Sequence, residues 1–435
     1  MKIEKLSSRL VTPSYEAKLF TPSISTTILL SPFDRAAGNF HIALIYTYKA
    51  PTPTNSSIEH GLRLALADYR EWAGRLTDDA GAIVLDDKGV RFVEAMASCT
   101  LDEASPLKLT PQLCDLHPSV EGIEELMQVQ LTRFMCGSLV VGFTSNHLIA
   151  DGEATGSFLL AWGQATRGLT DYPVPIHDRA VVKPRDPLSI EFDHLGKEYR
   201  EKSLVKEVPW EEMASQVRVE KTPFSPEFLA KLKARASVRC PSGRGYSTFE
   251  SLVSHIWQKV TRARGVGEEE TSQLRIPINM RTRVVPPIAH GYFGNMVLWA
   301  FPRATVRELL SQPLDRVAEV VHAAIAQVND RYARSFVDFD AGVEREGRWS
   351  ELVSTGDLES TVCCPNLEAN SWLRIPFDEM DFGSGAPDAF MPCFIPLEGI
   401  MAIVPAMHEM GAMDVYLSLL DSQRAVFKEI CHTID

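Results

Sequence analysis

The chain has 435 residues, of which 45% are hydrophobic and 23% are charged, and it carries a formal net charge of −13 at pH 7. This composition is that of a soluble globular protein, and the length predicts about two domains of roughly 200 residues each. The acidic balance argues against a nucleic-acid partner, and no apolar run approaches the roughly 20 residues that a membrane helix needs.

The first residues and the cysteines bear on the compartment. The start, MKIEKLSSR, is charged and contains no apolar stretch, so no secretory signal is expected. The eight cysteines are scattered without a CxxC pair, which favours reduced thiols over a disulfide framework or a zinc site. We therefore expect a cytoplasmic monomer that binds no metal and no membrane.

Strand and helix patterns alternate along the first third of the chain. An N-terminal strand and a turn are expected between residues 11 and 34, and a second strand over 40–48. A hairpin is expected over 82–93, with its turn at an Asp-Asp-Lys-Gly stretch. A helix is expected over residues 56–76, because large apolar side chains recur there at helical spacing. Residues 126–132 and 138–146 are expected to pair as a second hairpin.

The stretch 138–167 organises the first half of the chain. Its first part, SLVVGFTSN, is β-branched and apolar and predicts a buried strand. The part after Gly152 has helical spacing, with Asp151 as a suitable N-cap and Gly168 as a suitable stop. His147 lies where the strand passes into the helix, a rigid position that suits a general base. The alternatives are a purely structural histidine, or a zinc site with Asp151, for which no further ligands lie at a usable spacing.

The second half begins after a proline-rich, charged stretch. We expect domains at residues 1–185 and 223–435, joined by a crossover over 186–222. Some late strands are expected to complete the first domain. Helices are expected over 226–236, from the Ser247–Glu250 capping box, and from Thr305 to about residue 331 with a break at Pro313. Strands are expected over 274–278, 296–301, 390–405 and 413–419, and Asp421 is expected to cap a last helix.

Two motifs together resemble those of the plant BAHD acyltransferase superfamily. HLIADG at residues 147–152 matches the HxxxD(G) signature, and DFGSG at 381–385 resembles DFGWG with a serine in place of tryptophan. LSPFD at 30–34, YREWAGRL at 69–76 and GYFGN at 291–295 are similar to further family segments. The resemblance spans nearly the whole chain and is strongest to the grass amine N-hydroxycinnamoyltransferases, which also lack that tryptophan.

The resemblance implies a fold and a reaction. The fold is α/β, chloramphenicol-acetyltransferase-like, with two similar domains, each a mixed β-sheet flanked by helices, and a channel between them that carries His147. The reaction is acyl transfer from hydroxycinnamoyl-CoA, a co-substrate, to a small amine such as agmatine or putrescine, without a tightly bound cofactor. His147 would act as general base in a direct transfer within a ternary complex.

The resemblance and the surrounding residues also suggest supporting roles. Asp151 would pair with Arg281 and fix the histidine loop. A structural loop near CoA would contain Asp381, Gly383 and Gly385. The oxyanion and acceptor region would be lined by Ser371, Trp372 and, if the chain bends at residues 369–370, by Glu368, which could hold a distal ammonium. Cations that could bind the CoA phosphates are Lys183, Arg185, Lys259, Arg262 and Arg264.

Three alternatives remain open at this point. One is an O-hydroxycinnamoyltransferase that uses an alcohol such as shikimate. Another is a covalent route through Cys363 or Cys364, neither of which has an obvious local base. The third is a catalytically silent binding protein, against which the presence of both His147 and Asp151 argues.

Overall fold

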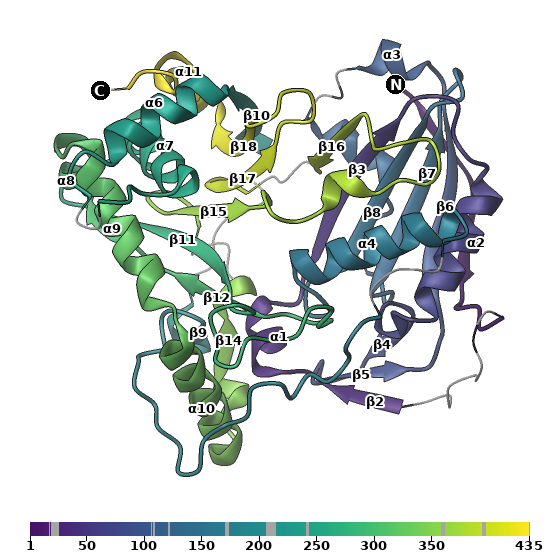
Figure 1. Cartoon of the computed structure of the whole chain (residues 1–435), viewed down its shortest axis with the longest axis horizontal. Helices are drawn as coiled ribbons and strands as arrows, with labels where there is room; N and C mark the ends of the chain where they lie inside the picture. Colours follow the sequence, from purple (N-terminus) through teal and green to yellow (C-terminus); the bar gives the residue numbers. More distant parts are fainter. Residues whose placement is uncertain are drawn as a thin grey trace. The chain divides into compact units, whose positions relative to one another are not determined.

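The computed structural model describes residues 1–434 except residues 17, 19–25, 106, 108, 121, 170–173, 206–214, 241–242, 358–361 and 394–396. The chain forms two compact units, each built from several stretches (Figure 1). The first unit comprises Met1–Val181, Ile288–Met296 and Arg374–Phe394. The second comprises Val182–Pro287, Val297–Leu373 and Ile395–Asp435. Two short stretches from the second half of the sequence thus belong to the first unit.

The first unit is built on a mixed six-stranded sheet. Its strands lie in the order β1 (Ile3–Val11), β6 (Val90–Ala97), β7 (Met127–Arg133), β8 (Leu139–Asn146), β3 (His41–Tyr48) and β16 (Ala389–Pro392). β6 and β7 run parallel, and the other neighbours run antiparallel. A smaller sheet has the order β2 (Thr26–Leu29), β5 (Ala82–Leu85) and β4 (Arg75–Leu76).

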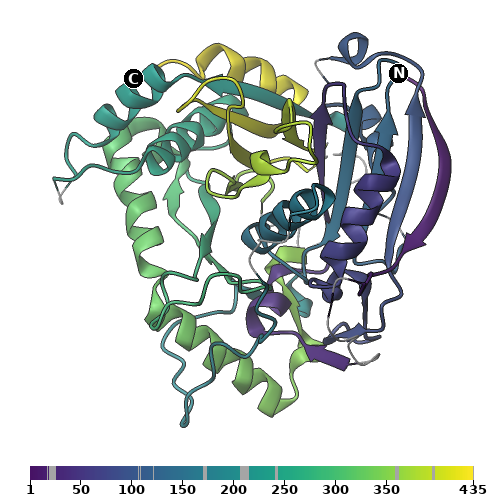
Figure 2. The ribbon, with the colours of Figure 1, turned by 45° about the vertical axis from the view of Figure 1, so that its right-hand side comes forward.

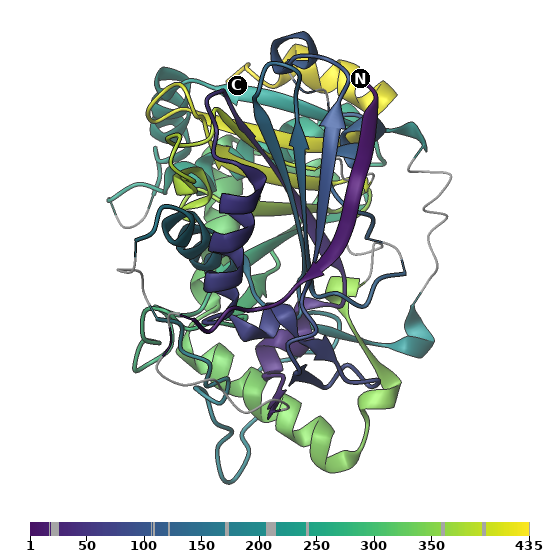
Figure 3. The same ribbon diagram turned by 90° about the vertical axis from the view of Figure 1, so that its right-hand side faces the viewer.

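Two helices cover one face of the six-stranded sheet (Figures 2 and 3). They are α2 (Asn55–Leu66) and α4 (Gly152–Thr166), and they pack on each other, with Trp162 Nε1 donating to the carbonyl of Ile58 (2.9 Å). The core beside α4 is an aromatic cluster with ring centroids 5.0 to 6.4 Å apart, formed by Tyr69, Trp72, Phe143, Phe158 and Phe293. Such rings bury large apolar areas, so the two elements that frame residues 147–151 are firmly placed. The short helices α1 (Pro32–Ala37) and α3 (Leu101–Ala104) complete this unit.

The second unit also has a mixed sheet. Its order is β10 (Val217–Phe224), β18 (Met413–Leu420), β17 (Ile400–Pro405), β15 (Leu367–Ser371), β11 (Thr271–Asn279) and β12 (Val297–Ala300), with β13 (Arg303–Thr305) pairing with β11. β15 runs parallel to both β11 and β17. Helix α7 (Thr248–Arg264) packs against α6 (Pro226–Ala236), α9 (Leu314–Gln327) and α11 (Asp421–Ile430). The remaining elements are α8 (Val306–Ser311), α10 (Asp330–Glu346) and the pair β9 (Tyr199–Glu201) and β14 (Leu352–Ser354).

Both units therefore combine a mixed sheet with flanking helices, which confirms the predicted α/β fold class. The hairpin of β7 and β8, the helix α6, the Ser247 capping box and the break at Pro313 are also as predicted. None of the helices among the described residues has the length and apolar character needed to span a bilayer.

Several local predictions are wrong. The strand expected over residues 390–405 is two separate strands, β16 in the sheet of the first unit and β17 in the sheet of the second. The helix expected to reach residue 76 ends at Leu66, and a separate 3-10 turn follows at Arg70–Ala73. Arg70 is drawn out of helical register because its guanidinium pairs with Asp87 (3.0 Å). β5 and β6 do not form a hairpin, since β5 pairs with β2 and β4 while β6 pairs with β1 and β7. The last helix begins at Asp421 with Leu420 as its N-cap, so Asp421 is not the cap.

Candidate active site

The loop that carries His147 connects the buried strand β8 to helix α4. Asp151 is the N-cap of α4, and Gly168 follows the helix with φ +73°, so the predicted cap and stop are confirmed. His147 is half-buried, and its backbone N–H donates to the carbonyl of Phe40 (2.8 Å). The His147 ring lies beside the Phe40 ring, with the centroids 5.2 Å apart. The strand end thus presents this histidine on a short, rigid connection.

Asn295, the last residue of the GYFGN segment, holds the backbone of this loop. Its Nδ2 donates to the carbonyls of His147 (2.9 Å) and Leu148 (3.2 Å). Asp34 holds Asn295 in turn, because Asp34 Oδ1 accepts from both the backbone N–H (2.8 Å) and Nδ2 (3.0 Å) of Asn295. Both side chains are fully buried. Buried polar groups that are hydrogen-bonded in this way rigidify their surroundings.

Arg179 connects the same loop to a buried ionic cluster. One guanidinium nitrogen donates to the carbonyl of Ile149 (2.9 Å), and another lies 2.8 Å from the carboxylate of Asp34. Glu71 lies 4.0 Å from Arg179 and pairs with His177 at 2.7 Å. Three consecutive loop carbonyls are therefore held by side chains from outside the loop. Because a buried ion that loses its partner costs several kcal/mol, the cluster resists rearrangement.

The sequence signal for these positioning residues was present but incomplete. Asp34 ends the LSPFD segment and Asn295 ends GYFGN, and both segments were noted as similar to family segments. The two segments alone predict no role for either residue, and none of the motifs described above contains Arg179. A pairing between Asp34 in the short helix α1 and an arginine 145 residues away leaves no periodic pattern in the sequence, so only the three-dimensional structure brings the three residues together.

Both carboxylate oxygens of Asp151 accept hydrogen bonds from backbone N–H groups. Oδ1 accepts from the N–H of Ala154 (3.1 Å) as a helix cap, and Oδ2 accepts from the N–H of Met296 (2.9 Å). The side chain is buried, which suits a structural role. Arg281 follows β11 in the second unit and is buried, with its backbone N–H donating to Asn279 Oδ1 (3.0 Å). Its pairing with Asp151 stays a prediction.

The Asp381 loop packs on the helix that follows His147. One oxygen of Asp381 accepts from the N–H groups of Gly383 (2.7 Å) and Gly385 (2.8 Å), and the other lies 3.2 Å from Arg167 at the end of α4. Both glycines have positive φ, +111° and +94°, which side chains other than glycine resist. At Gly163 of α4, a Cβ would lie 2.8 Å from the carbonyl oxygen of Asp381. Close contact between helix and loop thus depends on a small residue.

The acceptor candidates lie along β15 in the second unit. Residues 368–371 pair in unbroken register with residues 400–403, so the bend needed at residues 369–370 is absent. Glu368 and Ser371 therefore lie on opposite faces of the strand. Glu368 Oε2 is 3.1 Å from the buried Arg275, and its Oε1 accepts from Asn370 (2.8 Å). Trp372 is half-buried, and its backbone N–H donates to the carbonyl of residue 403 (2.9 Å).

The structure argues against Cys364 as a nucleophile. The backbone N–H of Cys364 donates to Glu398 (2.8 Å), and desolvation raises the pKa of its thiol above the ordinary value. A nucleophilic cysteine needs a lowered pKa, because the thiolate is the reactive form. His147 is therefore the better candidate for the chemistry.

Most of the cations proposed for CoA already have partners within the second unit. Arg264 pairs with Glu398 (2.6 Å), Lys259 is buried with its Nζ on Thr433 (3.1 Å), and Arg185 pairs with acidic side chains. Lys183 and Arg262 are exposed. A different set of cations surrounds a cavity of about 240 Å³ whose described lining has no acidic side chain: Lys197, Arg200 and Arg303. A cavity lined by cations, with no acidic side chain in its described lining, is better suited to binding a phosphate than an arginine that already pairs with a carboxylate.

Asn295 and Arg179 together form a clamp on the carbonyls of residues 147–149. The model of a family described as the Transferase family matches residues 1–433. The chain belongs to this family. That membership confirms the predicted resemblance to the BAHD acyltransferases and the prediction that the chain is an acyltransferase.

Similar proteins span the whole chain. Agmatine coumaroyltransferase-1 of Hordeum vulgare is 44% identical over 100% of both chains, and Putrescine hydroxycinnamoyltransferase 3 of Oryza sativa subsp. japonica is 42% identical over 100% of both. Shikimate O-hydroxycinnamoyltransferase of Nicotiana tabacum is 31% identical over 99% of this chain and 100% of that one. Among solved structures, vinorine synthase has a TM-score of 0.72 at 20% identity, over 98% of this chain and 96% of that one. The last likeness shows the fold.

Proposed function

We propose that the protein transfers a hydroxycinnamoyl group, such as coumaroyl or feruloyl, from its CoA thioester to the amine of a small aliphatic acceptor such as agmatine or putrescine. The observation that carries the proposal is full-length identity of 42–44% to agmatine and putrescine hydroxycinnamoyltransferases, against 31% to the shikimate enzyme. In this proposal the acyl-CoA is a co-substrate, and the acyl transfer uses no tightly bound cofactor.

His147 has the chemistry that this reaction needs. The amine nitrogen attacks the thioester carbonyl carbon, and the imidazole accepts a proton from that nitrogen. The tetrahedral oxyanion then collapses, the carbon–sulfur bond breaks, and the CoA thiolate leaves with a proton returned by the imidazolium. The attacking species is the free amine. An aliphatic amine with a pKa of about 10 is mostly ammonium at neutral pH, so one proton goes to solvent before the attack and the imidazole accepts the second.

The clamp around the loop supports this role for His147. A general base is effective only when it lies within about 3 Å of the attacking atom, and small misplacements are costly in rate. Asn295 and Arg179 hold the carbonyls of residues 147–149, so the histidine backbone is placed before substrate arrives. Such preorganisation is typical of catalytic groups.

Oxyanion stabilisation is proposed to come from the Ser371 hydroxyl and the Trp372 indole. Preorganised donors at a developing oxyanion are worth about 2.7–4 kcal/mol each. Ser371→Ala should therefore lower kcat by roughly 10²-fold without changing the thermal stability. An unchanged kcat would remove this residue from the proposed site.

One assay separates the proposed function from its alternatives. Release of CoA thiol from coumaroyl-CoA is measured with agmatine, putrescine, tyramine, tryptamine or shikimate as acceptor. The proposal expects kcat/KM to be highest with agmatine or putrescine and the product to be an amide by mass spectrometry. Preference for shikimate would instead indicate an O-acyltransferase. The absence of thiol release with all five acceptors would favour the silent binding protein.

A further inference from the structure

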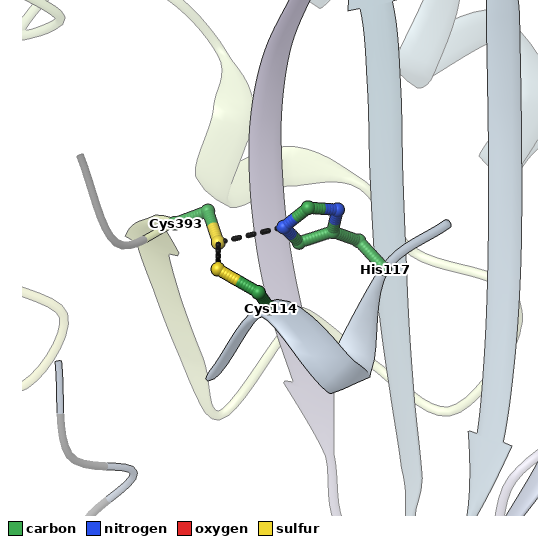
Figure 4. Close-up of side chains that lie close together, drawn as sticks. All are labelled: Cys114, His117 and Cys393. Atoms are coloured by element: carbon green, nitrogen blue, oxygen red, sulfur yellow. Dashed lines mark hydrogen bonds between the residues drawn. The ribbon is translucent and has the colours of Figure 1, made fainter. Parts of the chain in front are cut away.

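Three side chains of types that can bind a metal meet in the first unit (Figure 4). Cys114 lies in a 3-10 turn (Pro111–Leu116), His117 follows directly, and Cys393 comes directly after β16. The two sulfur atoms are 3.9 Å apart, and His117 Nε2 is 2.9 Å from the sulfur of Cys393. All three ligand atoms lie within 4.8 Å of one another. The residues converge from positions 276 apart in sequence.

The histidine has the tautomer that a metal ligand requires. His117 Nδ1 lies 2.7 Å from the carbonyl oxygen of Pro118. A carbonyl has no proton to give, so Nδ1 must be the donor. In neutral imidazole Nε2 then carries the lone pair, and this atom faces the sulfurs (Figure 4). Histidines that bind metals in proteins typically donate their other N–H to a carbonyl or carboxylate in the same way.

The three side chains are also held in place by the sheet beneath them. The turn that carries Cys114 lies so close to β8 that a Cβ at Gly142 would be 2.1 Å from the carbonyl oxygen of Leu116. Gln130 of β7 donates to the carbonyl of residue 115 (2.7 Å). Cys393 is fixed from the other side, since its backbone N–H donates to the carbonyl of residue 43 in β3 (3.0 Å). The cluster is therefore preorganised by three neighbouring strands of one sheet.

We propose that Cys114, His117 and Cys393 bind one thiophilic cation, Zn²⁺, with solvent as the fourth ligand. Two sulfurs that each lie about 2.3 Å from a tetrahedral zinc are about 3.8 Å apart, close to the separation in the structure. The Nε2–sulfur separation would open to about 3.5 Å, a small rotation of the imidazole. His117 and Cys393 are buried while Cys114 is exposed, which leaves a path for the ion and an open position for water.

Binding would tie two distant stretches together. Cys393 ends the strand β16, which joins the first sheet from the second half of the sequence, and Cys114 lies in the turn against β8. An ion that binds the folded but not the unfolded chain stabilises the fold by mass action. We therefore assign the site a stabilising role, independent of the proposed acyl transfer and of its success or failure.

The test uses the full chain, stripped of metal and fully reduced with a phosphine. Zn²⁺ affinity is measured by competition with a chromophoric chelator, and Co²⁺ is added to a second sample to record the thiolate-to-cobalt charge-transfer band. The expected results are one equivalent bound, a band of tetrahedral sulfur-ligated cobalt, and a rise in Tm with Zn²⁺. Cys114→Ser should weaken Zn²⁺ binding at least about tenfold and remove most of the band.

Cys136→Ser is the matched control, because Cys136 is another exposed thiol of the same unit that lies outside the cluster. It should bind Zn²⁺ and Co²⁺ as the unchanged protein does. Cys393→Ser gives a second loss of binding if it folds, as judged by circular dichroism. Binding that is equal in the Cys114→Ser variant, or no saturable binding to the reduced protein, would overturn the proposal. A Cys114–Cys393 disulfide that survives the phosphine treatment and excludes Zn²⁺ would also overturn it.

Discussion

At the scale of single residues, the position of His147 follows from backbone contacts that come from far away in sequence. Asn295 and Arg179 donate to the carbonyls of residues 147–149, and Asp34 holds both donors. A histidine on a turn without such contacts could change its backbone conformation at a small cost in free energy. Here any such change would leave a buried amide and a buried guanidinium without acceptors, which is costly.

His147→Ala should lower kcat with coumaroyl-CoA and agmatine by roughly 10²–10⁴-fold. The fold should remain, because the ring is half-buried and the clamp acts on the backbone of the loop. His408→Ala, at an exposed position in the second unit, is the control and should keep full turnover. Near-normal turnover of a folded His147→Ala protein would rule out the general-base role.

Asp151→Asn should harm stability as well as rate. The amide that replaces the carboxylate has only one acceptor oxygen, so either Ala154 or Met296 faces an NH₂ group in place of an oxygen. A buried donor without an acceptor costs about 1–3 kcal/mol. If Arg281 also pairs with Asp151, as predicted, the loss should approach about 3–5 kcal/mol. Urea unfolding measures it, and an inactive variant of unchanged stability would argue for a direct role of Asp151 in the chemistry.

Glu368→Gln tests whether this carboxylate binds the distal ammonium of the acceptor. Its pairing with Arg275, whose guanidinium also lies 4.3 Å from the Trp299 ring centroid, predicts a lower Tm because a buried cation loses its counter-charge. A carboxylate that also bound a distal ammonium would raise the KM for agmatine far more than that for tryptamine. We expect the lower Tm with similar KM changes for both acceptors. A selective rise for agmatine would return Glu368 to the acceptor site.

At the scale of elements, α4 links the histidine loop to the Asp381 loop through its glycines. A Cβ at Gly152 would lie 2.4 Å from Ile375, and one at Gly156 would lie 2.8 Å from the same side chain. At Gly163 the obstacle is the backbone of Asp381, which cannot move aside as a side-chain end can. The glycines on one face of α4 therefore allow the segment before and at the DFGSG motif to pack closely against the helix.

Gly163→Ala should destabilise the protein although alanine is the better helix former. The new methyl group would lie 2.8 Å from the Asp381 carbonyl oxygen, closer than any normal contact. Gly342→Ala in α10 is the matched control, because its nearest neighbour would be at an ordinary 3.7 Å. That control should gain up to about 1 kcal/mol from helix propensity. Urea unfolding of both variants gives the comparison, and a gain at Gly163 equal to that at Gly342 would show that helix and loop are not in tight contact.

Local patterns predicted elements well where the local signal and the tertiary packing agree. The β7–β8 hairpin, α6 and the capping box at Ser247 depend on alternation, helical spacing and capping chemistry, all of which lie within a few residues. The prediction failed at residues 67–76, where Arg70 is held by Asp87 seventeen residues away. It failed again at residues 82–93, because β6 has a better partner in β1, whose sequence lies about eighty residues earlier. Pairing choice is a property of the sheet and not of either strand.

At the scale of the molecule, what could not be predicted is which distant stretches meet. The two family motifs identified His147 and Asp381 from sequence, but Asn295, Arg179 and Asp34 reached the site only through tertiary contacts. The same is true of the cysteine–histidine cluster. Cys114 and His117 form a Cys-x-x-His spacing that could have drawn attention, yet Cys393 is 276 residues from His117. A contact between residues so far apart in the chain produces no local sequence pattern from which it could be predicted.

The stability of the ionic cluster that holds the histidine loop should depend on pH through His177, which pairs with Glu71. Burial alone lowers the pKa of His177, but the hydrogen bond and the negative charge of Glu71 raise it by more, so its pKa in the folded protein is above the ordinary value. Arg179, 4.0 Å from Glu71, opposes this rise without reversing it. A histidine whose pKa is raised by folding adds stability that is fully present below its unfolded pKa of about 6.5. That stability is lost as the pH rises through the higher, folded pKa.

The difference in unfolding free energy between the unchanged protein and His177→Gln should therefore be largest near pH 5.5–6 and shrink toward pH 8.5. Glutamine keeps a neutral hydrogen-bond donor for Glu71 but cannot carry the charge, so the comparison isolates the titration. Urea midpoints across this pH range measure the difference, with His408→Gln as an exposed control that should follow the unchanged protein at every pH. A gap between His177→Gln and the unchanged protein that is constant with pH would mean that His177 stabilises the cluster as a neutral residue. The charge of Glu71 would then be balanced by Arg179 alone.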